Sequence, residues 1–200
     1  SYTPPFNWTV FSVEHTWCQS WMPDKTPAYG AYSDYHHLFP THHNAANVKR
    51  NNHPLGIVHD IESQFMEGKL GISESGKVVY EPRKSHKGDA ARALLYMAIC
   101  YNGKNTKDWT FNKLNTSILP GLSEGIMDLD LLLFWSQQDP PDEWEKNRNN
   151  WIFNLQQNRN PFVDYPEWIK LINFNTLASV QPGTFAIEPA VYPSNITALA

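Results

Sequence analysis

The sequence predicts an α+β domain, and three observations lead to this prediction. The 200 residues suit one compact domain, and 41% hydrophobic residues against 18% charged residues is a composition that can bury a core. Short alternating segments with β-branched residues occur in the first half of the chain. Stretches rich in strong helix formers occur from residue 90 onward. We therefore expect a small strand-strand-helix unit that packs against a helical body.

The first fifty-five residues predict a strand, a long loop, a second strand and a short helix. Residues 8–14 (WTVFSVE) alternate and include β-branched residues, which is typical of a strand. Residues 35–39 (YHHLF), closed by Pro40, are the second predicted strand. The segment NAANVKRNN, over residues 44–52, has better helix formers and is followed by Pro54 and Gly56, which favours a short helix.

The rest of the chain predicts one hairpin and three helices. The hairpin spans residues 70–80 with Ser75-Gly76 as its turn. The clearest helix covers residues 90–101 (AARALLYMAICY) and is expected to lie in the core. A second helix is predicted over residues 128–137, and a third begins after Pro140-Pro141 and reaches residue 158, with acidic residues in its first turn.

Composition and charge exclude several classes of protein. A net charge of −4 and a pI of about 6 give no whole-molecule attraction for a polyanion, so nucleic-acid binding would depend on local patches. The sequence has no stretch of eighteen consecutive apolar residues, so it predicts no transmembrane helix, and we expect no membrane partner. Cys18 and Cys100 are too few for a disulfide scaffold or a thiolate zinc site, and the sequence leaves open whether they pair.

Histidine is concentrated at the start of the chain. Seven of the eight histidines precede residue 60: His15, His36, His37, His42, His43, His53 and His59. Any one of them taken alone is more often a hydrogen-bonded structural residue than a metal ligand. The pairs His36-His37 and His42-His43 are adjacent, so their side chains point apart, which disfavours a closed zinc site. A histidine-rich, metal-sequestering protein would need several of these side chains to converge on one ion.

A second pattern favours chemistry on phosphate. A hard divalent cation such as Mg²⁺ takes one or two protein oxygen ligands and keeps several waters, which leaves room for a phosphate oxygen. The carboxylate of Glu14 and the amide oxygen of Asn47 would suit such an ion. His15, next to Glu14, has a neutral imidazole near pH 7 that can remove a proton from an attacking water.

The chain resembles the endonuclease I family, which comprises non-specific bacterial DNA/RNA nucleases with a ββα-metal (His-Me finger) site. Five segments in the order of the family, across roughly residues 10–170, form this resemblance: Glu14-His15-Thr16-Trp17 with Ser20-Trp21; Asp34-Tyr35-His36-His37-Leu38-Phe39-Pro40; Asn47-Val48-Lys49-Arg50-Asn51-Asn52 with Gly56; Glu81-Pro82 leading to Lys87-Gly88-Asp89-Ala90-Ala91-Arg92; and Asn158-Arg159-Asn160-Pro161-Phe162-Val163-Asp164. The chain departs from the family pattern on both sides of Glu14-His15. Ser12-Val13 precede this pair, and Cys18-Gln19 follow it.

The resemblance implies a role for each matched residue. His15 would be the general base, Arg50 a further catalytic residue, and Glu14 and Asn47 the ligands of a single metal ion. The ion would be Mg²⁺, with Mn²⁺ or Ca²⁺ as alternatives for the same oxygen ligands. Local positive charge from Lys49, Arg83, Lys87 and Arg92 is expected to contact the phosphates of the substrate. Asp34, His36 and His37 are expected to support the site structurally.

The predicted function is that of an Mg²⁺-dependent, non-specific endonuclease, a phosphodiester hydrolase that leaves 5′-phosphate ends on DNA, with RNA as a further candidate substrate. The alternative is a weak or inactive nuclease-fold module that binds nucleic acid. We expect a monomer, secreted or periplasmic as the resemblance implies. Residues 1–175 would be the nuclease domain, with an N-terminal part of the family domain preceding Ser1. Residues 176–200 would be a linker or the start of a following module of fibronectin type III.

Overall fold

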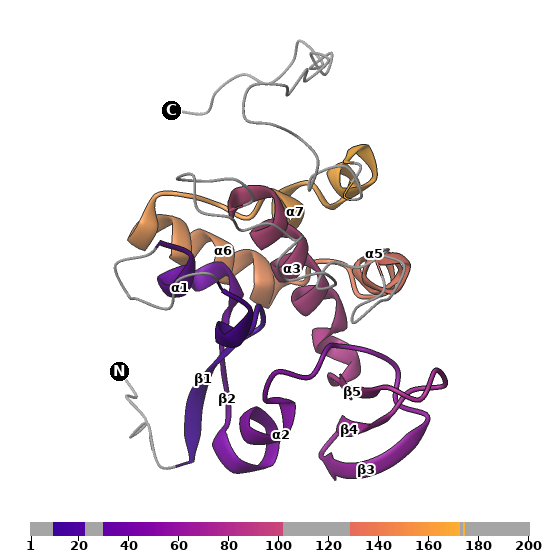
Figure 1. The fold of residues 1–200 in the computed structure, drawn as a ribbon. Coiled ribbons are helices and arrows are strands. Elements are labelled where there is room, and N and C mark those ends of the chain that lie inside the picture. Colours follow the sequence, from indigo (N-terminus) through magenta and orange to yellow (C-terminus); the bar gives the residue numbers. More distant parts are fainter. Residues whose placement is uncertain (1–9, 23–29, 102–128, 173, 175–200) are drawn as a thin grey trace.

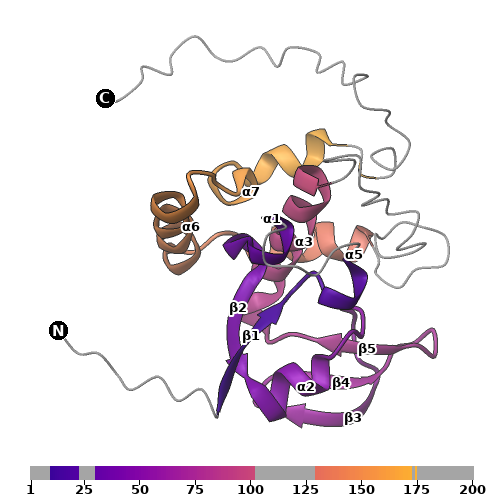
Figure 2. The same ribbon diagram turned by 60° about the vertical axis from the view of Figure 1, so that its left-hand side comes forward.

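The computed structural model describes residues 10–22, 30–101, 129–172 and 174, which form a mixed α and β fold. A two-stranded hairpin and a three-stranded sheet lie below a group of helices in both ribbon views (Figures 1 and 2). The α+β class is therefore confirmed. The segment 176–200 and the predicted ends of several elements lie outside the described residues.

The hairpin and the helix that follows it form the unit expected near the N-terminus. Strand β1 (Phe11–His15) pairs antiparallel with β2 (Leu38–His42), which places Glu14 opposite Phe39 and His15 opposite Leu38. A π-helical turn over His43–Asn47 continues into α2 (Val48–Arg50). The order strand, loop, strand, helix is thus confirmed.

The second strand begins three residues later than the sequence suggested. The side chain of Asp34 accepts a hydrogen bond of 2.8 Å from the backbone N–H of His36, and Tyr35–His37 form a 3-10 turn. This local bond competes with extended backbone, as is usual for aspartate. Pro40, expected to close the strand, lies inside β2 opposite Val13. Both strands of a two-stranded sheet are edge strands, where proline is tolerated.

The second sheet contains the predicted hairpin and one strand that was not predicted. Strands β4 (Gly68–Ile72) and β5 (Val78–Glu81) pair antiparallel, and Gly76 has the positive φ of 79° that favours glycine in their turn. The additional strand β3 (Asp60–Phe65) pairs with β4 at the edge of the sheet. Its side chains are nearly all exposed, so its sequence has no alternating apolar pattern.

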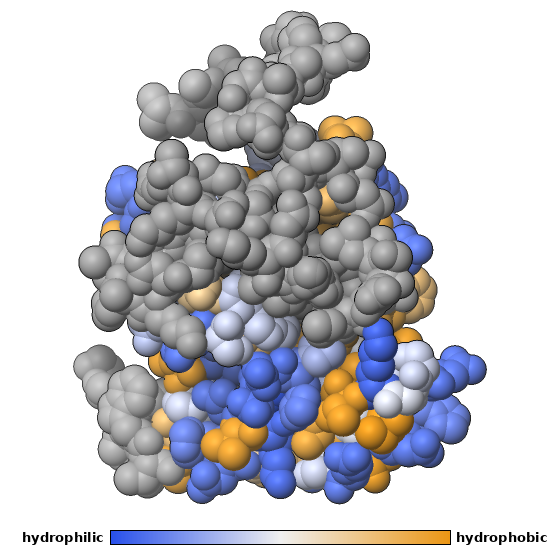
Figure 3. All heavy atoms as spheres, viewed as in Figure 1, coloured by the Kyte–Doolittle hydropathy of each residue, from blue (hydrophilic) through white to orange (hydrophobic). Residues whose placement is uncertain are grey.

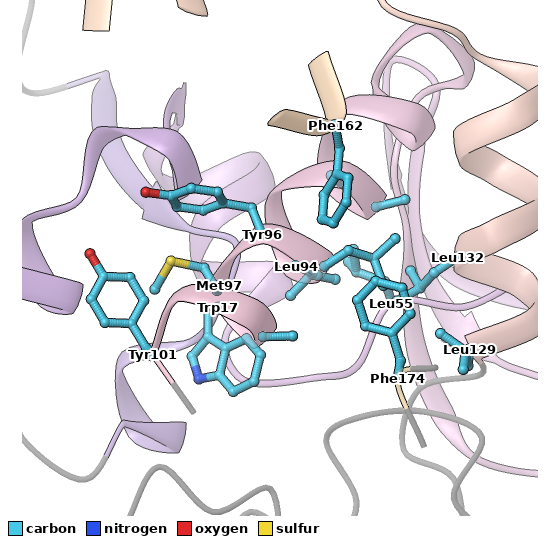
Figure 4. Close-up of a cluster of buried hydrophobic side chains, with 14 of the residues drawn as sticks. Trp17, Leu55, Leu94, Tyr96, Met97, Tyr101, Leu129, Leu132, Phe162 and Phe174 are labelled. Carbon is cyan, nitrogen blue, oxygen red and sulfur yellow. The ribbon is translucent and has the colours of Figure 1, made fainter. Parts of the chain in front are cut away.

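The helical body is built around α3 (Lys87–Tyr101), which is the predicted core helix. Leu94, Leu95 and Met97 are fully buried and pack with Trp17 from the N-terminal loop and Phe162 from a later helix (Figure 4). Among the described residues, α3 is followed by α5 (Leu129–Gln138), α6 (Glu143–Gln156) and α7 (Pro161–Asp164). Helices α5 and α6 confirm the second and third predicted helices. A 3-10 helix over Pro166–Leu171 follows.

Two further expectations concern single features. Cys18 is buried, Cys100 is half-buried, and the two are not bonded to each other. Within the described ranges, no helix has both the length and the apolar character needed to cross a membrane.

Candidate active site

Glu14 of β1 and Asn47 of the π-helical turn lie on one face of the hairpin. Ser12 and Glu14 share this face because side chains alternate along a strand. The amide nitrogen of Asn47 donates hydrogen bonds to Ser12 Oγ at 2.7 Å and to the carbonyl of Val13 at 3.1 Å. These two bonds fix the amide and leave its oxygen, Oδ1, as the atom that can bind a further partner.

The carboxylate of Glu14 is held by two neighbours. Its Oε2 accepts a hydrogen bond from Thr16 Oγ1 at 3.3 Å, and its Oε1 lies 3.7 Å from Arg50 Nε. The Arg50 guanidinium is buried behind Glu14, where it donates to the carbonyls of Thr16 and Asn51 and lies 5.2 Å from the ring centre of Trp21. Arg50 therefore sits in the interior as a fixed positive charge next to the Glu14 carboxylate.

The imidazole of His15 is oriented by the loop between the two strands. Its Nε2 lies 3.1 Å from the backbone carbonyl of Tyr32, and because a carbonyl can only accept, the proton is assigned to Nε2. The other nitrogen, Nδ1, is then an acceptor, and it receives a hydrogen bond from the amide of Gln19 at 3.2 Å. Burial lowers the pKa of His15, while the Tyr32 hydrogen bond and the charge of Glu14 oppose this shift. The side chain is thus a neutral imidazole with a basic nitrogen.

Sequence reasoning missed two of these neighbours. Gln19 had a signal, because it lies four residues after His15, in the Cys18-Gln19 pair at which the chain departs from the family pattern. Its amide also lies 3.3 Å from the hydroxyl of Tyr32. Tyr32 had no signal, because its two contacts with His15 depend on how the loop folds: the hydrogen bond of its backbone carbonyl and the packing of its ring, whose centre lies 5.0 Å from that of the imidazole.

Asp34 lies between the hairpin and the helical body, where it anchors the loop to α3 and α6. Its carboxylate accepts hydrogen bonds from Tyr96 and Tyr101 of α3 at 2.8 and 2.6 Å, and from Gln156 of α6 at 2.8 Å. Burial alone would raise the pKa of Asp34, but these donors and the His36 N–H lower it below its ordinary value. The arrangement agrees with the supporting role expected for Asp34.

His36 and His37 are buried on either side of the same loop. His37 lies next to His15, with 5.3 Å between the two ring centres, and its Nε2 bonds the Ala31 carbonyl at 2.9 Å. Burial lowers the pKa of His37 to about 3, so it stays neutral. His36 bonds the carbonyl of Asn158 at 3.3 Å. Both histidines thus bond backbone carbonyls, and their supporting role stays a prediction.

The four cations expected to contact phosphate lie in different environments. Lys49 and Arg83 are exposed. Lys87 forms an ion pair of 2.5 Å with Glu81 and lies 5.3 Å from the ring centre of Trp135. Two of the four therefore present their charge to solvent, and Lys87 is partly neutralised.

Arg92 is in the interior rather than on the surface where a phosphate contact was expected. It is fully buried and forms a two-pronged ion pair with Glu145 of α6, at 2.9 and 2.5 Å, and a further bond of 3.1 Å to Asp89. It also donates to the carbonyls of Ser136 and Asp139 at the end of α5. These partners lie on α3, on α6, and in or directly after the last turn of α5, so Arg92 joins the three helices.

The oxygen atoms present fit a hard divalent cation of low protein ligand number. Glu14 supplies a carboxylate and Asn47 a pre-oriented amide oxygen on the same face. In the described part of the chain, no three or more His, Cys, Asp and Glu side chains are grouped to hold a metal ion. A site of one carboxylate, one amide and waters does not need such a group, whereas a histidine-rich metal store does.

Comparison with known sequences identifies the relationship. The profile of the endonuclease I family matches residues 6–167, which is most of the chain. The chain belongs to the endonuclease I family. This confirms the resemblance seen in the sequence, and the hairpin, the following helix and α3 all fall within the matched range.

Named relatives of the chain are bacterial nucleases. An extracellular ribonuclease of Bacillus amyloliquefaciens is 37% identical over 156 residues, which cover 78% of this chain and 51% of that protein. An extracellular deoxyribonuclease of Aeromonas hydrophila is 30% identical over 131 residues, covering 66% of this chain and 49% of that protein. A periplasmic deoxyribonuclease of the same organism is 28% identical, covering 66% and 47%. The chain therefore spans about half the length of these relatives.

Proposed function

We propose that this endonuclease I family member is a metal-dependent, non-specific endonuclease with a ββα-metal site formed by β1, β2 and α2. The observation that carries the proposal is the hydrogen bond between His15 Nε2 and the Tyr32 carbonyl. It leaves Nδ1 as an acceptor on the residue next to Glu14. A general base and an anionic oxygen ligand are thus provided by adjacent residues at the end of one strand.

In this proposal His15 acts on the attacking water. Nδ1 takes a proton as the water oxygen forms a bond to phosphorus, and the bond from phosphorus to the 3′ oxygen breaks. The leaving 3′ oxygen takes a proton from a solvent water, so the products carry 5′-phosphate and 3′-hydroxyl ends. The hydrogen bond from Gln19 to Nδ1 must open for water to reach this nitrogen, which makes Gln19 part of the entrance to the base.

Glu14 and Asn47 would hold the ion, with Mg²⁺ preferred and Mn²⁺ or Ca²⁺ able to use the same oxygens. When bound, a divalent cation neutralises charge that develops on the phosphate oxygens and the leaving oxygen. Thr16 and Arg50 keep the Glu14 carboxylate in place, and Ser12 keeps the Asn47 amide in place. Lys49 and Arg83 are the cations available to contact phosphate from solvent.

The relatives support the substrate class and the location. Their names include both ribonucleases and deoxyribonucleases, so we propose DNA and RNA as substrates. Those names also describe extracellular or periplasmic proteins, and we propose a secreted or periplasmic location. We further propose a monomer. The nuclease domain would extend to about residue 175, because the family match ends at residue 167 and the last described helix ends at Leu171.

A supercoiled-plasmid assay tests the proposed activity. With Mg²⁺ the protein should convert the plasmid to nicked and linear forms without discrete fragments, and EDTA should stop the reaction. An excess of Mg²⁺ added after EDTA should restore it. Binding of the plasmid without any cleavage at any divalent ion would instead favour the inactive nucleic-acid-binding module, and cleavage that persists in EDTA would contradict the metal dependence.

A further inference from the structure

A cavity of about 420 Å³ lies on the Glu14 side of the hairpin. It is open to solvent and is lined by residues of β1, β2 and α2 on one side and of the sheet β3–β5 on the other, with further residues from the start of α3 and of α6. Figure 3 shows hydrophobic patches among hydrophilic ones in the lower part of the molecule, where α2 and β3–β5 lie. The volume falls within the usual range of small-molecule sites, about 300–1,000 Å³.

Aromatic rings line both walls of this cavity. Phe39 and Phe65 face it from β2 and β3, and the ring of His42 lies 4.9 Å from that of Phe65. His86 lies against Phe39, with 4.6 Å between the ring centres. Trp144 of α6, which is 51% exposed, also lines the cavity. A flat aromatic ligand could therefore meet ring faces or edges on more than one side.

The polar groups of the cavity suit a nucleotide. Glu14 lines it and so joins it directly to the candidate metal site. Arg83, exposed and also in the lining, offers a positive charge for a phosphate. A purely apolar ligand would use neither group, whereas a nucleotide has an aromatic part and an anionic part that match both.

We propose that this cavity binds one unpaired nucleobase of the substrate strand next to the cleaved phosphate. The proposal rests on the proposed nuclease function and specifies its substrate class. A base inside a duplex has its edge paired and its faces stacked, so it cannot enter the cavity without being extruded. Stacking tolerates any base, because every base has a π-face, so the cavity favours unpaired segments without adding sequence specificity.

The test measures binding rather than cleavage. Two fluorescent oligomers of about ten nucleotides are compared, one of deoxythymidine and one of abasic sugar-phosphate. The binding of each oligomer to the whole protein chain is measured by fluorescence anisotropy in the presence of EDTA. Both carry the same phosphates. The wild-type protein should bind the thymidine oligomer about 10-fold more tightly or better, the scale of one stacked base. Phe65→Ala and Trp144→Ala should each remove most of this difference.

Trp151→Ala is the matched control. Trp151 lies on the same helix, is equally exposed at 57% against 51% for Trp144, and does not line the cavity. It should leave the preference for bases intact. Equal affinity of the wild type for the two oligomers, or an equal loss in Trp151→Ala and Trp144→Ala, would overturn the proposal.

The result is separable from that of the plasmid assay. Base-dependent binding in a protein that does not cleave would uphold the cavity and refute the proposed hydrolysis. Cleavage with base-independent binding would uphold the hydrolysis and refute the cavity.

Discussion

Replacing His15 with alanine should lower the rate of phosphodiester cleavage by about 10²-fold or more, the scale of general-base loss. The substitution removes the Nδ1 acceptor but no oxygen ligand, so binding of Mg²⁺ and of nucleic acid should persist. Initial rates of plasmid nicking at saturating Mg²⁺ measure the loss. The thermal unfolding temperature, measured in parallel, should show that the variant is folded.

His59→Ala is the control for this loss. Its side chain is 68% exposed and pairs with Asp60 at 3.2 Å, away from the hairpin. It should cleave at the wild-type rate. If His15→Ala does so as well, His15 is not the base.

Replacing Arg92 with alanine should destabilise the fold by about 3–5 kcal/mol, the cost of leaving a buried charge without its partner. Glu145 and Asp89 would keep their carboxylates in the interior, at 4% and 7% exposure, without the guanidinium that now pairs with them. Urea unfolding, followed by tryptophan fluorescence, measures the free energy of unfolding. The large effect is expected because Arg92 joins three helices.

Arg159→Ala provides the comparison for Arg92. Its ion pair with Asp164 is similarly short, at 2.6 Å, but the side chains are 34% and 23% exposed. Such a pair contributes about 0.2–1 kcal/mol. An Arg92→Ala protein with wild-type stability and weakened nucleic-acid affinity would instead support the phosphate contact inferred from the sequence.

Prediction of the fold from the sequence succeeded where a pattern is local. It failed where an element depends on contacts with residues that are distant in the sequence. The sequence of α3 specifies a helix by composition, and nearly all of its side chains are buried. The start of β2 could not be placed, because it depends on Asp34, whose carboxylate also receives bonds from α3 and α6. Strand β3 was missed because it is an exposed edge without apolar alternation.

The candidate site was predictable in its residues and less so in its surroundings. Glu14, His15 and Asn47 follow from their chemistry and order, and the structure places Glu14 and Asn47 on one face of the hairpin. Their assigned roles stay predictions. Positive charge was a poor guide to exposure, since Arg92 pairs with Glu145, fifty-three residues further along the chain. A distant partner of this kind leaves no local signal in the sequence.

The Mg²⁺ dependence of the cleavage rate tests the division of roles most directly, when wild type, Glu14→Gln, Asn47→Ala and His15→Ala are titrated side by side. Loss of an oxygen ligand should raise the Mg²⁺ concentration at half-maximal rate in Glu14→Gln and Asn47→Ala. His15→Ala should keep the wild-type half-maximal concentration and reach only a small fraction of the maximal rate. A His15→Ala protein that recovers full rate at high Mg²⁺, or a Glu14→Gln protein with an unchanged Mg²⁺ requirement, would contradict the assignment of base and ligands.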